Sequence, residues 1–213
     1  MRRKAMGHSI SDRIFLAFVW VVLSLFLLLV AYPLLYVFFA SFSGGMNTLG
    51  LSLLPRRFSL EGYRAVFAYK WIWIGYRNSL FYLACGTLLS LFVTICCAYP
   101  LSRPDFSGGK VVMGLCVVTM YFSGGLIPTY LVVKEMGMLD SPLAILLPGA
   151  LSVYNMIVMR TYFSTQIPEE MREAAQLDGC GDLRFLTKIV LPLSIPVLAV
   201  IGLYYAVATW NSY

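Results

Sequence analysis

The amino-acid sequence predicts an all-α membrane protein, a polytopic bundle of transmembrane helices. Of its 213 residues, 60% are hydrophobic and only 12% are charged, whereas a soluble domain usually carries about a quarter charged residues. Its mean hydropathy is +0.79. Apolar runs without any charged residue recur along the chain, and an α-helix needs about 20 such residues to cross the hydrocarbon core. These observations exclude an ordinary water-soluble globule.

Five apolar runs predict a transmembrane domain over residues 14–213, which follows a short N-terminal segment, residues 1–13. The first run contains no charged residue and is too long for a typical signal-peptide core. We therefore expect it to remain in the membrane, with a cleaved signal peptide as the alternative. A short surface helix is expected near residues 59–70, and one long polar loop, residues 165–190, precedes the last run. The predicted spans are 14–42, 76–101, 111–133, 143–164 and 191–213.

The distribution of Lys and Arg predicts the orientation of the chain. Cytoplasmic loops of membrane proteins are enriched in these residues. Ten of the 16 fall on the side of residues 1–13, the turn after the second run and the loop 165–190, five fall on the other side, and Arg77 lies at a boundary. This bias predicts a cytoplasmic N-terminus and a cytoplasmic loop 165–190. The formal net charge of +6 is scattered between apolar runs, so no nucleic-acid partner is expected.

The residue types that carry catalysis or bind metals are sparse. Four of the five cysteines lie inside apolar runs, and His8 is the only histidine. The chain therefore offers no zinc pattern and no Ser-His-Asp triad. It also lacks the glycine-rich phosphate loop of ATPases. We expect no catalytic residue, no metal site and no cofactor, and a membrane enzyme is disfavoured.

The polar loop contains signals for a short helix over residues 168–177. Pro168 suits a helix start because it lacks the N–H that would be unpaired there, and the carboxylates of Glu169 and Glu170 favour the positive end of the helix dipole. Asp178 and Gly179 provide a stop. A helix of about ten residues is too short to be stable alone. Composition leaves two interpretations open, a helix that docks into another protein and an amphipathic helix on the membrane surface.

The spacing of residues in this loop distinguishes the two interpretations. Glu173-Ala174-Ala175 is followed after three residues by Gly179, and after nine more by Ile189, Leu191 and Pro192. This register resembles the EAA pattern of ABC importer permeases, with every position filled. The segments 123–130, 147–150, 159–163 and 210–211 are similar to the carbohydrate-uptake branch of that family. The resemblance implies a type I importer fold with six spans, so we expect that a sixth span is missing after Tyr213.

The resemblance also implies a mechanism and a set of partners. The helix 168–177 would dock into a groove of a cytoplasmic ATPase subunit, with Glu173 as a charged contact and Gly179 as the turn. Leu191 and Pro192 would anchor the return to the membrane. The implied setting is the bacterial cell membrane and its lipid. The implied partners are ABC ATPase subunits, a second homologous permease, an extracellular solute-binding lipoprotein and a carbohydrate, an oligosaccharide or a polysaccharide-derived sugar.

Candidate substrate contacts come from the chemistry of sugar recognition, which uses aromatic faces together with amide and hydroxyl groups. Four residues in the predicted spans fit this chemistry: Tyr154, Asn155, Trp210 and Asn211. A single Asn in a membrane helix can instead bond only a neighbouring helix, and that alternative stays open. An ion-coupled carrier usually places charged groups at mid-membrane, and none of the five runs has an Asp, Glu, Lys or Arg in its middle. Such a carrier is therefore disfavoured.

Overall fold

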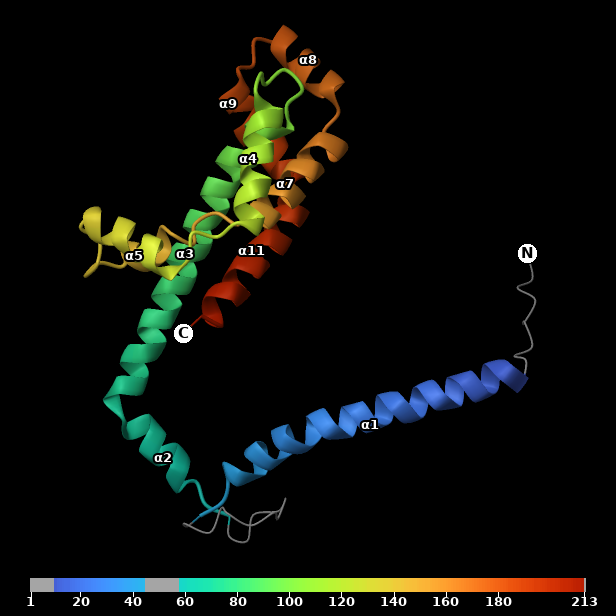
Figure 1. Cartoon of the computed structure of the whole chain (residues 1–213), viewed down its shortest axis with the longest axis vertical. Coiled ribbons are helices and arrows are strands. Elements are labelled where there is room, and N and C mark those ends of the chain that lie inside the picture. Colours follow the sequence, from blue (N-terminus) through green and yellow to red (C-terminus); the bar gives the residue numbers. More distant parts are fainter. Residues whose placement is uncertain (1–9, 45–57, 213) are drawn as a thin grey trace. The chain divides into compact units, whose positions relative to one another are not determined.

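The computed structural model describes residues 10–44 and 58–212. Within this part of the chain the regular secondary structure is helical, apart from one isolated antiparallel bridge between Ser43 and Phe58. The predicted all-α class is therefore confirmed. The chain divides into two compact units, Met1–Ile74 and Gly75–Tyr213. The boundary between the units falls within one long helix, α3, so each unit is described separately (Figure 1).

The first unit contains helices α1 (Ile10–Ala40) and α2 (Glu61–Ala68). The end of α1 is held against the segment around α2. Phe42 stacks on Phe58 with ring centroids 5.5 Å apart, and the hydroxyl groups of Ser41 and Tyr63 lie 2.8 Å apart. The Glu61 N–H donates to Ser59 Oγ at 3.2 Å. Thus α1 covers most of the first predicted span, and α2 lies where a short helix was expected.

Helix α3 (Lys70–Ser102) contains the whole of the second predicted span. Small residues recur every fourth position on its buried face: Gly86, Ser90, Thr94 and Ala98. This spacing places them on one side of the helix and lets a neighbouring helix approach closely.

The third and fourth predicted spans contain breaks. Helices α4 (Gly109–Tyr121) and α5 (Leu126–Glu135) meet at 117°, because Gly125 has a positive φ of 83° that few other residues tolerate. The next apolar run forms a single turn, α6 (Leu143–Leu146), then an irregular stretch and α7 (Val153–Gln166). Apolar composition alone does not reveal these interruptions.

The C-terminal part consists of several short helices followed by a longer one. These are α8 (Glu169–Leu177), α9 (Asp182–Phe185), the π-helix η1 (Leu186–Val190), α10 (Leu191–Leu193) and α11 (Ile195–Trp210). The segment Asp182–Leu193 meets α11 at 81°. By length and composition, two of the described helices, α1 and α3, can each cross a membrane. If the bent pair α4–α5 and the bent pair formed by Asp182–Leu193 and α11 each count as one span, the number of candidate spans rises to four. The number of five spans stays a prediction.

In the second unit, α3, α4, α7 and α11 lie side by side (Figure 1). The buried apolar side chains of α3, α7 and α11 form one cluster, which partly buried residues of α4 contact and which extends to the end of the bundle carrying α8 and α9. Met156, Met159, Ile201 and Phe185 are its largest fully buried members. Because Phe185 of α9 and Ala175 of α8 belong to the same cluster, these short helices are packed onto the bundle.

Candidate functional site

Helix α8 begins and ends at the residues that the sequence indicated. Pro168 precedes it in an extended conformation, and Glu169 and Glu170 occupy the first turn. At the other end, the Gly179 N–H donates to the Gln176 carbonyl and the Cys180 N–H to the Ala175 carbonyl, both at 2.9 Å. This pair of bonds is a Schellman motif, and it requires a left-handed residue at the position that Gly179 occupies with φ of 74°.

The EAA residues face in different directions on this helix. Glu173 and Ala174 are exposed, whereas Ala175 is buried against the apolar cluster. Leu177 is 90% exposed, which is unusual for a leucine at the end of a short helix. The helix therefore has one side attached to its own chain and an outer side that presents a carboxylate, a small methyl group and a large apolar side chain.

The remaining motif residues lie where the chain returns to the bundle. Ile189 is partly buried in the π-helix η1, Leu191 is partly buried at the start of α10, and Pro192 follows it in an exposed position. π-helical turns are rare and frequently occur at functional sites. The motif thus covers α8, its terminating turn and the π-helical return, all of which lie at one end of the second unit.

The structure separates the four candidate substrate residues. Asn155 is 7% exposed and lines a cavity of about 400 Å³ between α3, α7 and α11. Tyr154, Trp210 and Asn211 do not line this cavity, and Tyr154 and Trp210 are exposed. The polar side chains that accompany Asn155 were not identified from the sequence: Ser90, Ser152, Tyr204, Tyr205, Thr209 and Ser212. The four-residue spacing of small and hydroxyl residues on α3 was the available signal.

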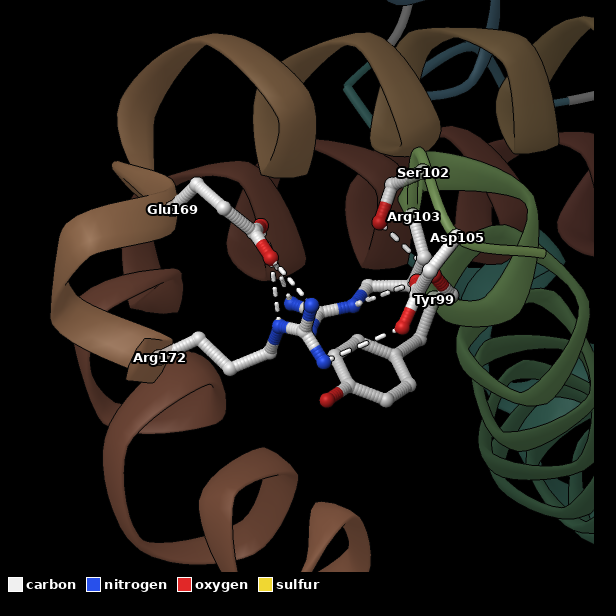
Figure 2. A network of polar contacts seen from close by, with 6 residues as sticks. All are labelled: Tyr99, Ser102, Arg103, Asp105, Glu169 and Arg172. Carbon is white, nitrogen blue, oxygen red and sulfur yellow. Dashed lines mark hydrogen bonds and ion pairs between the residues drawn. The ribbon is translucent and has the colours of Figure 1, made fainter. Parts of the chain in front are cut away.

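A network of charged side chains connects α8 to the loop after α3, and Figure 2 shows it at close range. Arg172 Nε donates to Glu169 Oε1 at 2.6 Å within α8, and Arg172 Nη1 lies 3.1 Å from Asp105 Oδ2 in the loop. Arg103 Nη1 is 3.8 Å from Glu169 Oε2, and Arg103 Nε is 3.9 Å from Asp105 Oδ1. The two arginine side chains are only 11% and 12% exposed.

The surroundings of Arg103 extend this network to two further elements. Its guanidinium lies 5.5 Å from the Tyr99 ring centroid on α3 and 5.9 Å from the Phe185 ring centroid on α9. Nearby, Arg160 Nε of α7 donates to the Leu101 carbonyl oxygen at 2.7 Å. The sequence interpretation treated residues 102–109 as a turn only, and it paired none of these charges.

Comparison with known proteins assigns this architecture to a family. The family model of the "binding-protein-dependent transport system inner membrane component" matches residues 5–213. The chain belongs to this family. It is therefore an inner-membrane transport component and not an enzyme. Members of this family work in general with an ATPase, a solute-binding protein and a second permease.

Two individual relatives show the extent of the similarity, and the name of the first refers to transport. The chain is 42% identical over 204 residues to the polygalacturonan/rhamnogalacturonan transport system permease protein YtcP of Bacillus subtilis strain 168. The aligned region covers 95% of this chain and 71% of the relative. It is 38% identical over 183 residues to protein LplC of the same organism, with coverage of 85% and 62%.

A solved structure has the same fold. It is a bacterial ABC transporter involved in the import of the acidic polysaccharide alginate, and it matches with a TM-score of 0.90 and 38% identity over 97% of this chain and 74% of that chain. These comparisons confirm the sequence-based assignment to the permeases of carbohydrate-uptake ABC importers. They leave the roles of individual residues as predictions.

Proposed function

We propose that this chain is the membrane-spanning permease subunit of an ATP-driven importer for an oligosaccharide or a polysaccharide-derived sugar, and that α8 couples it to a separate ATPase. The observation that carries this proposal is the geometry of α8 in a chain of this family. Glu173 and Ala174 are exposed on a short helix, and this helix ends in a Schellman turn at Gly179. Such a helix is suited to enter a groove on a partner.

The chemistry of the chain supports an external energy source. The glycine-rich phosphate loop of ATPases does not occur in its sequence. Glu173 supplies a charged contact to the ATPase, Ala174 and Ala175 keep the helix narrow, and Gly179 ends it. Ile189, Leu191 and Pro192 carry the movement of α8 back to the bundle through η1 and α10.

The names of the relatives support a carbohydrate as the substrate. One similar protein is named for the transport of polygalacturonan and rhamnogalacturonan, and another for the import of the acidic polysaccharide alginate. A third, GanQ of Bacillus subtilis, is named for the transport of galactooligosaccharides. In this chain, the cavity beside Asn155 contains amide and hydroxyl groups. These groups form hydrogen bonds of the kind that sugar hydroxyls require.

The orientation follows from the same proposal. With the N-terminus in the cytoplasm, α8 and its charge network face the cytoplasmic ATPase, and the binding protein delivers sugar from the opposite side. The excess of Lys and Arg in the predicted cytoplasmic connections supports this arrangement. A homologous permease then completes the passage beside this chain.

The proposal is tested by charge reversal at Glu173 in the assembled importer. The permease is reconstituted with its partner permease, ATPase and binding protein, and uptake of labelled trigalacturonate, an alginate trisaccharide and maltotriose is measured. Glu173→Lys should remove ATP-dependent uptake while leaving the amount of permease in the membrane unchanged. A cysteine introduced at Ala174 should crosslink to the ATPase in intact cells.

The matched control is Glu135→Lys, which makes the same charge change on an exposed residue at the end of α5. It should transport normally. Full ATP-dependent uptake by Glu173→Lys, or crosslinks from position 174 that never reach an ATPase, would contradict the coupling role. No ATP-dependent uptake of any of the three sugars by the unmodified complex would contradict the carbohydrate assignment.

A further inference from the structure

The main chain does not by itself fix the orientation of α8. Before the helix, Ile167 and Pro168 are extended, with ψ of 99° and 144°. After it, Gly179 is left-handed, so the chain turns away from the helix axis. Neither neighbouring helix continues into α8. Side-chain contacts must therefore determine how a movement of α8 is transmitted to the rest of the protein.

Apolar packing provides only a small part of these contacts. Ala175 is the buried residue of α8, and it contributes a single methyl group to the cluster. Of the two larger apolar side chains of the helix, Met171 is 38% exposed and Leu177 is 90% exposed. A movement transmitted through Ala175 alone would let α8 rotate about that contact.

The charge network provides the firmer attachment. Asp105 and Arg103 belong to the loop that directly follows α3, and Glu169 and Arg172 belong to the first turn of α8 (Figure 2). An exposed ion pair holds two elements weakly because water screens it. Here Asp105 and Glu169 are 57% and 36% exposed, but both arginines are nearly buried, and a buried charge that loses its partner is destabilising. The loop and α8 are therefore costly to separate.

The end of α3 connects to more than α8. Arg103 lies close to the ring of Tyr99 on α3 and to that of Phe185 on α9, an arrangement in which aromatic faces attract a cation. Arg160 of α7 holds the Leu101 carbonyl. Residues 101–105 thus contact the elements on both sides of α8 in the sequence, α7 and α9, as well as α8 itself.

From these contacts we propose that the loop 103–108 is a second part of the coupling element. Arg103, Asp105, Glu169 and Arg172 lock the end of α3 to α8, so that both move as one body when the ATPase moves α8. Arg172 and Asp105 act as positioning residues in this proposal. The α3 helix then receives the movement directly and carries it to the cavity beside Ser90. This inference rests on the proposed coupling role of α8.

The test measures the distance between α8 and α3 with and without the ATPase engaged. The five native cysteines are replaced, and spin labels are attached to cysteines at Gln176 on α8 and Phe92 on α3, both exposed positions. The assembled importer in nanodiscs is compared before and after trapping with ATP and vanadate. With the network intact, the labels should keep their separation within about 2 Å, the size of ordinary helix shifts.

Neutral variants should release this constraint. In Asp105→Asn combined with Arg172→Gln, trapping should change or broaden the distance distribution beyond that limit. Arg172→Lys keeps the positive charge, so its distance distribution should stay close to that of the unmodified complex. A role of Arg172 in packing alone would not explain this result. Lys110→Gln removes a nearby exposed positive charge outside the network and should behave like the unmodified complex.

Two results would overturn the inference. The first is a large change of the distance on trapping while the network is intact, and the second is an unchanged distribution in the neutral double variant. Copurification of the ATPase separates these results from failure of the proposed function. If the ATPase binds normally but the distances contradict the prediction, the network is not a coupling element. If the ATPase never associates with the unmodified permease, the proposed function itself fails.

Discussion

The hydroxyl groups of Tyr205 on α11 and Thr94 on α3 lie 2.7 Å apart, both in buried residues. The Tyr205 hydroxyl also accepts a hydrogen bond from the Ser152 N–H at 3.1 Å, just before α7 begins. One side chain thus joins three parts of the bundle beside the cavity that Asn155 lines. Within a bilayer, this arrangement satisfies polar groups that lipid cannot.

Replacing Tyr205 with phenylalanine should loosen this junction. Tyr205→Phe removes both hydrogen bonds while keeping the ring, and interhelical hydrogen bonds in membranes contribute about 0.6 to 1.7 kcal/mol each. We expect a lower unfolding temperature of the detergent-solubilised protein. Tyr204→Phe is the matched control because Tyr204 is half exposed. Equal unfolding temperatures for the two variants would show that the Tyr205 bonds contribute nothing to stability.

The close approach of α3 and α11 gives a second prediction. A Cβ atom built at Gly202 would lie 3.3 Å from Leu91 Cδ1, the end of a flexible side chain. Gly202→Ala should therefore be tolerated, whereas Gly202→Val should force the helices apart and destabilise the protein by about 1 to 3 kcal/mol. Thermal unfolding checks this difference. Gly114→Val is the control, because a Cβ there meets nothing within 4 Å, and equal losses for both valine variants would contradict the prediction.

The sequence predicted some parts of this fold accurately because their signals are local. The bounds of α8 follow from Pro168, the acidic first turn and Gly179, and the predicted helix differs from the observed one by a single residue. The break between α4 and α5 was not predicted in this way. Gly124, Gly125 and Pro128 permit a bend, but in a membrane helix they are also common without one.

The candidate site was predicted as a motif but not as an assembly. The EAA residues all lie within one short stretch of the chain, from Glu173 to Pro192, so the sequence located the motif directly. The contacts of Arg172 with Asp105, and of Glu169 with Arg103, join segments that are far apart in the chain. Their pairing depends on how α3 and α7 pack. The positive-inside pattern places both loops on one side of the membrane, but it does not say which charges meet.

The turn after α8 provides a test of backbone strain. Gly179 has φ of 74°, and a Cβ added there would meet no atom within 4 Å. Any loss of stability in Gly179→Ala therefore comes from the left-handed conformation, which costs about 1 to 2 kcal/mol. We expect faster proteolysis of the loop 165–190 and weaker ATPase binding. Gly181→Ala should be neutral, because Gly181 has φ of −75° and equally open space. Identical proteolysis rates for the two alanine variants would contradict the role of the turn.

The cavity beside Asn155 gives the last prediction, which concerns the substrate. Asn155 is the one sequence-predicted candidate that lines this cavity, so Asn155→Ala should raise the KM for uptake of the transported trisaccharide severalfold with little change in kcat. Asn211→Ala makes the same chemical change at an exposed position outside the cavity and should leave uptake unchanged. If Asn155 only bonds a neighbouring helix, its loss should lower the unfolding temperature and leave KM as it was. That result would remove the amide from the sugar passage, because a contact with substrate must affect the concentration at which transport saturates.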